Sequence, residues 1–280
     1  MTDDPYGMAA RAAEVLAERT GRARHDVAVW LGSGWADAAE RIGTGVEVAL
    51  PDVPGFTPTS AGGHRAVVRS VDVGGLGVLV FLGRVHLYEG HDVNTVVHSV
   101  RTAACAGCRV AVLTNAAGYL RREWRLGSAI LVADQINATG VSPLTGPHPP
   151  AGWGPRFCDM TSLYSPRLRD LARRVDPDLA EGVYYGLRGP QFETPAEIRM
   201  IGVVGGDLVG MSTVNEAIAA RHAGMEVLGI SLATNLAAGL AAGPLSGEEV
   251  IEAGRAAAAA VGDLLRSILV ELAADAGRAR

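Results

Sequence analysis

The chain has 280 residues, of which 48% are hydrophobic and 20% are charged, and its formal net charge is −5. This length allows a large buried core, and the apolar content excludes intrinsic disorder. A negative charge argues against nucleic acid as a partner, because proteins that bind nucleic acid carry a basic footprint. No apolar run approaches the roughly 18 residues of a membrane span, and residues 1–4 lack the basic start of a signal peptide. We therefore expect a cytoplasmic protein that binds neither nucleic acid nor a membrane.

Apolar runs typical of strands alternate along the chain with amphipathic segments typical of helices. Strands are expected at 27–31, 66–73, 76–82, 109–113, 129–132, 183–187, 207–211 and 226–232. Helices are expected at 9–18, 36–41, 93–106, 166–175, 195–202, 213–223 and 250–274. The last helix follows the capping-box pattern of Ser246 and Glu249, and Gly74-Gly75 predicts a hairpin that makes the sheet mixed. The alternation predicts an α/β fold, and the absence of a linker predicts one domain over residues 1–280.

Neither the cysteines nor the histidines suggest a metal or redox centre. Cys105 and Cys108 have redox spacing, but they end an apolar helical stretch, so buried structural thiols are the favoured interpretation. The seven histidines form no HxxxH or HExxH pair, and we expect no metal site. The basic cluster of residues 121–125 is interrupted by Glu123 and is interpreted as a solvated loop.

The least regular segment, residues 141–160, contains five prolines. A loop of this length in a compact domain is usually functional or contacts a partner, but a plain surface excursion is equally consistent with the residues.

The stretch "LGRVHLYEGHD" at residues 82–92 follows an apolar strand with Arg84, His86 and Tyr88 on alternate positions. In extended geometry these side chains share one face, because residues i, i+2 and i+4 point the same way. A guanidinium, an imidazole and a phenol side by side suit an anion. Arg84 in particular supplies a planar fork that matches phosphate oxygens.

Small or polar residues also follow several expected strands. These are Gly32-Ser33-Gly34, the run from Thr114 to Gly118, Ser212-Thr213 and Thr234-Asn235. Each alone is an ordinary turn or helix cap. Because ligands sit beyond the carboxyl ends of strands in α/β sheets, the set together predicts an anion-binding basin.

One carboxylate stands apart, in the sequence "RGPQFETPAEIRM". Thr194, Pro195 and Glu197 form a helix-capping pattern, which would leave Glu193 as a solvated neighbour. Alternatively, Phe192 stacks on a planar ring while Glu193 accepts hydrogen bonds from its N–H edge. On spacing alone the helix-capping interpretation is favoured.

Together these motifs resemble the purine nucleoside phosphorylases of the trimeric, low-molecular-mass class, in family order from about residue 27 to residue 254. The matching motifs are Gly32-Ser33-Gly34, Gly63-His64-Arg65, residues 83–90, Thr114-Asn115-Ala116-Ala117-Gly118, residues 189–194, Gly210-Met211-Ser212-Thr213 and Thr234-Asn235. The resemblance implies the nucleoside phosphorylase fold, a single domain with a mixed, distorted β-barrel-like sheet surrounded by helices.

The resemblance also implies residue roles. Phosphate would be held by Ser33, His64, Arg84, His86, Asn115, the Ala116 backbone and Ser212. The nucleoside would contact Tyr88, Ala117, Gly118, Tyr184, Phe192, Glu193, Val209, Gly210, Met211, Thr234 and Asn235. Catalysis would depend on Glu193, Asn235 and His86. Phe157, in the proline-rich loop, resembles an aromatic that closes the ribose site of a neighbouring subunit in a homotrimer.

The implied reaction is phosphorolysis of inosine and guanosine to a free purine and (deoxy)ribose 1-phosphate, in purine salvage. Phosphate is a co-substrate, and no cofactor is expected. Asn235 favours 6-oxopurines, because the related methylthioadenosine phosphorylases carry an aspartate there that accepts from a 6-amino group. The alternatives are 5′-methylthioadenosine phosphorylase and a non-catalytic purine- or phosphate-binding protein.

Three residues depart from the family pattern. Gly247 replaces a histidine that commonly binds the ribose 5′-hydroxyl, so 5′-modified nucleosides should be tolerated. Tyr119 replaces a second glycine, and Gln135 replaces a histidine; neither has a role assigned above.

Overall fold

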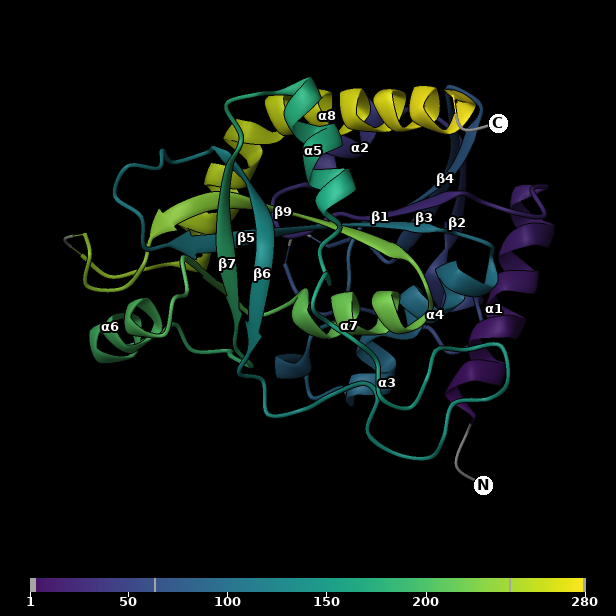
Figure 1. Cartoon of the computed structure of the whole chain (residues 1–280), viewed down its shortest axis with the longest axis horizontal. Coiled ribbons are helices and arrows are strands. Elements are labelled where there is room, and N and C mark those ends of the chain that lie inside the picture. The colour runs from purple at the N-terminus through teal and green to yellow at the C-terminus, as the bar shows by residue number, and fades with distance from the viewer. Residues whose placement is uncertain (1–3, 63, 242, 279–280) are drawn as a thin grey trace.

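The computed structural model describes residues 4–62, 64–241 and 243–278. Its strands form one mixed sheet in the order β2-β3-β4-β1-β5-β8-β7-β6-β9, and β5 also pairs with β9 (Figure 1). The strands are β1 (Val27–Trp30), β2 (Val46–Ala49), β3 (Val67–Val73), β4 (Leu76–Phe81), β5 (Val110–Tyr119), β6 (Ala129–Asn137), β7 (Ala180–Gly186), β8 (Leu208–Gly210) and β9 (Glu226–Leu236). The additional β5–β9 pairing closes β5 to β9 into a barrel, from which β1 to β4 extend as an open sheet. The predicted fold class, an α/β fold with a mixed, barrel-like sheet, is confirmed.

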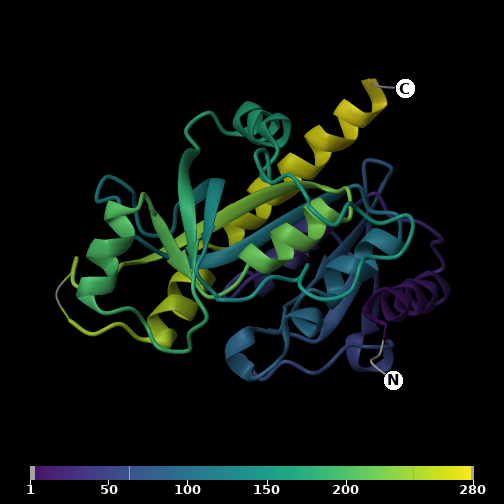
Figure 2. The same ribbon diagram turned by 60° about the horizontal axis from the view of Figure 1, so that its bottom comes forward.

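Helices cover both faces of this sheet (Figures 1 and 2). They are α1 (Pro5–Thr20), α2 (Ala39–Ile42), α3 (Val93–Val96), α4 (His98–Cys105), α5 (Pro166–Val175), α6 (Pro195–Val203), α7 (Val214–His222) and α8 (Gly247–Arg278), with 3-10 turns η1 (Ala36–Ala38), η2 (Leu50–Asp52) and η3 (Leu87–Glu89). Successive residues of β1 point into two separate cores, because strand side chains alternate between faces. Val27 and Val29 pack with α2, α5 and α8, whereas Ala28 and Trp30 pack with α1, α4 and α7.

Most predicted elements are confirmed, and the differences have local causes. α1 begins earlier than expected, at Pro5, because the Asp4 side chain accepts hydrogen bonds from two backbone amides of the first turn. The expected helix over 93–106 is divided into α3 and α4 at Val97. The edge strand β2 was not predicted, since only one of its four residues is buried and no clear apolar pattern marks it.

The predictions that two strands end at Leu113 and Leu232 were wrong. β5 and β9 continue together to Tyr119 and Leu236, with a register shift between Ala117 and Gly118. The polar residues there remain in the ladder, so the barrel itself carries these side chains to the cavity described below. This makes their placement more rigid than a loop would.

The cysteines only partly follow expectation. Cys108 is buried, as predicted, but Cys105 is exposed, so the prediction of a buried thiol was wrong there, and all three cysteines are free. Within the described ranges, no cluster of three or more His, Cys, Asp or Glu side chains could hold a metal ion. No helix in the same ranges is long and apolar enough to cross a membrane.

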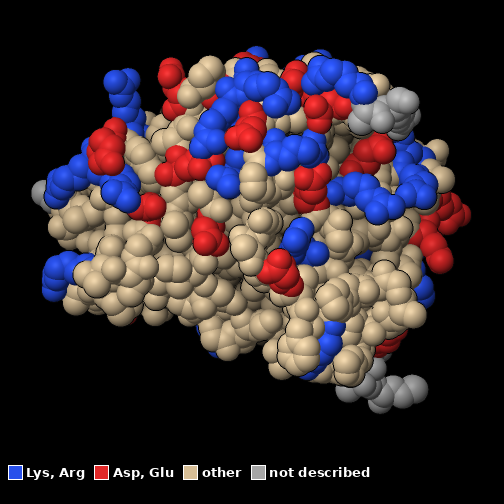
Figure 3. Space-filling view, viewed as in Figure 1, with Lys and Arg blue, Asp and Glu red and all other residues tan. Residues whose placement is uncertain are grey.

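Charged side chains are unevenly distributed over the face in Figure 3. They gather in the upper part, over α5 and α8, where Arg167 pairs with Asp275 at 2.6 Å and Arg174 pairs with Glu271 at 3.3 Å. The lower part, below α7, shows few charges.

Candidate functional site

A cavity of about 610 Å³ opens where β1, β4, β5, β8 and β9 end. Its wall consists of Gly32, Ser33, Gly62, Arg84, His86, Tyr88, Asn115, Ala116, Gly118, Phe192, Glu193, Val209, Gly210, Met211, Ser212, Thr234, Asn235, Ser246, Gly247, Glu248, Val250 and Ile251. The structure thus brings together most of the residues expected to hold phosphate and a nucleoside. The first turn of α8 closes one end of the cavity; sequence reasoning identified Gly247 there but missed Glu248, Val250 and Ile251.

Four expected site residues lie outside this wall: His64, Ala117, Phe157 and Tyr184. Ala117 is 2% exposed and points into the core, because neighbouring residues of β5 face opposite ways. Tyr184 is fully buried behind Gly210, where a Cβ atom would collide with its hydroxyl, so it supports the wall from behind. Phe157 is 92% exposed. Gly63, from one of the motifs, lies outside the described residues.

The segment after β4 places three of the expected side chains, although not by the predicted geometry. β4 ends at Phe81, and Tyr88 belongs to η3 rather than to an extended strand. Arg84, His86 and Tyr88 nevertheless all line the cavity. The rings of His86 and Tyr88 stack with their centroids 4.6 Å apart, so a helical turn replaces strand alternation as the reason for their proximity.

The guanidinium of Arg84 is fixed from several sides. Its side chain is only 3% exposed. One terminal nitrogen donates to Ser212 Oγ at 3.2 Å, and the other donates to the Trp30 carbonyl at 3.2 Å. Nε lies 3.3 Å from Oε1 of Glu216 on α7, whose side chain is 2% exposed. Glu216 was not identified from the sequence, since Thr213-Val-Asn-Glu216 has the form of a capping box.

The structure shows why this pattern misleads. Thr213 has φ 73° and ψ −48°, and Val214 N donates to the Ser212 carbonyl at 2.8 Å, which together describe a γ-turn. The Thr213 side chain does not cap α7. Instead, Thr213 Oγ1 accepts a hydrogen bond from Asn115 Nδ2 at 3.0 Å. Such backbone strain costs about 1–3 kcal/mol and persists where its surroundings enforce it. Here it turns Ser212 towards Arg84 and the cavity.

His64 supports the site from just behind Ser33. Burial, together with the charges of His86 and Arg84, lowers the pKa of His64 to about 3, so the ring is neutral. Its Nδ1 accepts from the Arg84 backbone N–H at 3.2 Å, and the ring proton is therefore on Nε2. Nε2 lies 3.0 Å from Ser33 Oγ and donates to it. The hydroxyl proton of Ser33 is consequently free for a ligand in the cavity.

His86 is oriented by a carboxylate. Its Nδ1 lies 3.0 Å from Glu89 Oε1, which leaves Nε2 on the other side of the ring. Burial alone would raise the pKa of Glu89, but hydrogen bonds from His86 and Ser60 hold it well below its ordinary value. Glu89 is therefore a permanent anion that fixes the imidazole.

Two further residues of the cavity wall offer one donor and one acceptor, Asn235 and Glu193. Thr234 Oγ1 lies 3.0 Å from Asn235 Oδ1, while Asn235 Nδ2 donates to the Leu236 carbonyl at 3.1 Å and keeps a second hydrogen. Burial raises the pKa of Glu193 above its ordinary value. Glu193 is half-buried in the wall rather than solvated, and Thr194 also caps α6 as the other interpretation required.

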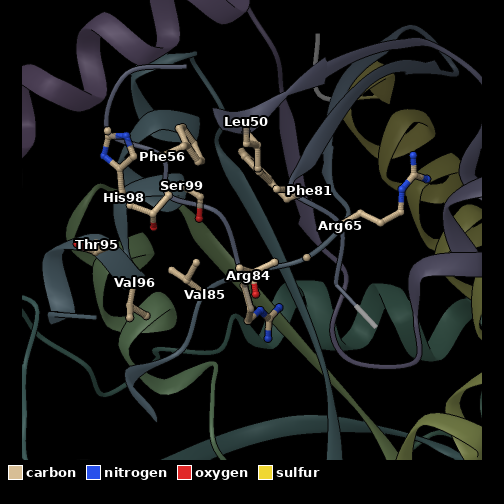
Figure 4. A pocket seen from close by; sticks show the side chains of 15 residues that line it. Leu50, Phe56, Arg65, Phe81, Arg84, Val85, Thr95, Val96, His98 and Ser99 are labelled. Atoms are coloured by element: carbon tan, nitrogen blue, oxygen red, sulfur yellow. The ribbon is translucent and has the colours of Figure 1, made fainter. Parts of the chain in front are cut away.

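A second, much smaller cavity of about 30 Å³ lies on the other side of the segment around Arg84 (Figure 4). The Arg84 side chain points away from Phe56 and His98, which line it. His98 Nε2 already bonds to the Pro54 carbonyl at 2.9 Å. At about 30 Å³, the small cavity lacks the volume for a nucleoside-sized ligand.

Comparisons with known proteins agree with this geometry. The family model described as "Phosphorylase superfamily" matches residues 26–270. A purine nucleoside phosphorylase of Mycobacterium tuberculosis is 54% identical over 268 residues, covering 95% of this chain and 97% of that protein. One from a Cellulomonas species is 52% identical over 271 residues, with 95% and 93% covered. The crystal structure of Schistosoma mansoni purine nucleoside phosphorylase in complex with adenosine superposes with a TM-score of 0.87 at 30% identity, covering 94% and 96%.

Proposed function

The chain belongs to the purine nucleoside phosphorylases of the phosphorylase superfamily, and we propose that its substrates are the 6-oxopurine nucleosides inosine and guanosine. The family cleaves purine nucleosides with phosphate as co-substrate. The presence of both Asn235 and Glu193 in the cavity wall carries the proposal. The free amide hydrogen of Asn235 suits N7 or O6 of the base, and the Glu193 carboxylate suits N1–H and a 2-amino group. Phe192, in the same wall, stacks on the purine.

We propose that phosphate lies at the Arg84 end of the cavity. Arg84, His86, Ser33 and Ser212 line this end, and the Ala116 backbone completes it. The orientation of two side chains supports this placement of phosphate. His64 donates to Ser33 Oγ and leaves the Ser33 hydroxyl proton free, and the contact of His86 Nδ1 with Glu89 leaves His86 Nε2 on the opposite side of the ring. Tyr88 and Met211, between the two subsites, contact the ribose.

In this arrangement phosphate attacks C1′ while the bond from C1′ to N9 breaks, and the departing purine gains negative charge. The amide of Asn235 stabilises that charge by donating to the base, and the phosphate subsite holds the nucleophile in line. The products are the free purine and (deoxy)ribose 1-phosphate.

Purine release from inosine, guanosine, adenosine and 5′-methylthioadenosine, each with and without phosphate, tests this proposal. We expect phosphate-dependent release from the first two only. Efficient release from methylthioadenosine would overturn the base assignment and favour a methylthioadenosine phosphorylase. Tight purine binding without release would instead indicate a non-catalytic binding protein.

The end of the cavity at α8 predicts tolerance of 5′-modified nucleosides. Gly247 lines it, and a Cβ atom there would meet nothing within 4 Å. A neutral hydrogen bond contributes about 0.5–1.5 kcal/mol, so its absence costs at most about tenfold in affinity. We expect kcat/KM for 5′-deoxyinosine to lie within about threefold of that for inosine. A strong preference for inosine would contradict this, whereas Gly247→His should create such a preference.

We further propose a homotrimer in which Phe157 enters a neighbouring subunit's site. Phe157 is almost fully exposed, yet its loop is fixed: Tyr6 and Trp153 rings lie 4.7 Å apart, and Arg101 donates to the Pro143 carbonyl at 2.9 Å. A rigid loop presenting an exposed aromatic is typical of an interface anchor.

Phe157→Ala should raise KM for inosine about tenfold, as expected for an interface anchor worth more than 1 kcal/mol. Co-expression with Asn235→Ala subunits should restore a normal KM in mixed trimers, because the second subunit supplies Phe157. Failure of this rescue, or a monomer by sedimentation, would contradict the shared site.

We also propose a cytoplasmic location. The three free thiols fit a reducing compartment, and cell fractionation tests the location.

A further inference from the structure

We propose that the negative charge of Glu216 weakens the binding of phosphate by Arg84, so that the sugar phosphate product can dissociate. The inference rests on the phosphate subsite proposed above. Among the described residues, Glu216 is the carboxylate paired with Arg84, at 3.3 Å from Nε. Both side chains are almost completely buried, so solvent screens their interaction little.

Glu216 is not required to orient the guanidinium. The terminal nitrogens of Arg84 are already held by Ser212 Oγ and the Trp30 carbonyl, both at 3.2 Å. The contact from Nε to Glu216 lacks the geometry of a hydrogen bond: neither Arg84 Nε nor Glu216 Oε1 has such a partner in the described part of the chain. Glu216 therefore contributes a negative charge beside Arg84 but does not orient its guanidinium.

The space beside Glu216 leaves no room for a ligand larger than water. The small cavity beside Glu216 measures about 10 Å³, which holds about one water molecule. His86, the other side chain assigned to phosphate, also has a carboxylate beside it, since its Nδ1 lies 3.0 Å from Oε1 of Glu89. Each of these two groups thus has its own carboxylate, and because Glu216 offsets the charge of Arg84, a phosphate dianion meets little net positive charge at that pair.

A reactant site benefits from this balance. Phosphate must bind, but ribose 1-phosphate must also dissociate in every cycle, and a bare buried guanidinium would hold both tightly. A carboxylate that neutralises Arg84 reduces both affinities together. Removing its charge should therefore tighten anion binding, whereas structural damage would loosen it, and the sign separates the two explanations.

The test is calorimetric titration of the full chain with inorganic phosphate alone. Glu216→Gln keeps the side chain's shape and should lower the Kd for phosphate about tenfold, and the inhibition constant of ribose 1-phosphate should fall in parallel. Glu216→Asp moves the charge away by one methylene group and should lower the Kd about threefold. Glu181→Gln, at an ion pair outside the cavity wall, should leave the Kd unchanged.

An unchanged or higher Kd in either folded Glu216 variant would overturn the inference; circular dichroism establishes folding. Glu216→Asp decides the question if Glu216→Gln does not fold. Arg84→Met separates this outcome from failure of the premise. If Arg84→Met leaves phosphate binding intact, the phosphate subsite itself is wrong and the inference falls with it.

Discussion

Glu193→Gln should reduce kcat/KM for inosine by roughly ten- to a hundredfold, because each hydrogen bond to a charged group contributes about 1.5–3 kcal/mol. The variant keeps the shape of the wall but loses the carboxylate that accepts from the base. KM for phosphate should stay unchanged, since Glu193 is assigned to the base and Arg84 to phosphate. Steady-state kinetics with each substrate varied in turn measure both quantities.

The same residue predicts a pH dependence. Burial raises the pKa of Glu193, so its carboxylate becomes protonated at a higher pH than an exposed glutamate would. As the pH falls through that pKa, the acceptor is lost and kcat/KM for inosine declines. The Glu193→Gln variant should lack this decline.

Glu197→Gln is a matched control four residues away. Glu197 caps α6 by accepting from Thr194 N at 2.7 Å, and it lies outside the cavity wall. Activity within about twofold of the unmodified protein is expected, because a glutamine oxygen still accepts this bond. Equal losses of activity in the two variants would indicate that the α6 region acts only structurally and would contradict the assignment of Glu193 to the base.

Asn235→Asp should reverse the base preference. An aspartate only accepts hydrogen bonds, so it opposes the acceptors N7 and O6 of a 6-oxopurine but suits the 6-amino group of adenosine. We expect kcat/KM to fall about a hundredfold for inosine and to rise about tenfold for adenosine, since an unpaired buried polar group costs far more than a poor fit.

The ratio of the two substrates serves as an internal control against general damage. Thr234, whose hydroxyl lies 3.0 Å from the Asn235 side-chain oxygen, remains in place in the variant. Parallel losses for inosine and adenosine, with their ratio unchanged, would refute the assignment of Asn235 to the purine. KM for phosphate should not move.

The sequence determined the fold class and most of the cavity wall. Alternating apolar runs specified the strands and helices, because burial imposes a period on each. The caps of α5 and α6 are also local signals, and the bounds of α5 matched residue for residue. Motifs at strand ends located Ser33, Arg84 and Asn235, since the chain itself carries these side chains to the edge of the sheet.

Only the tertiary structure decided how the site is supported. In the sequence, Glu216 has the position of a helix-capping residue. The γ-turn at Thr213 removes that cap, and Glu216 instead lies beside Arg84, which is 132 residues earlier in the chain. The continuation of β5 as a strand beyond Leu113 turned Ala117 into the core, and the Tyr184 hydroxyl lies behind Gly210 instead of in the cavity wall. Sequence patterns record local periodicity and local hydrogen bonds, whereas these relations depend on which distant strands pair and on which buried charges then meet.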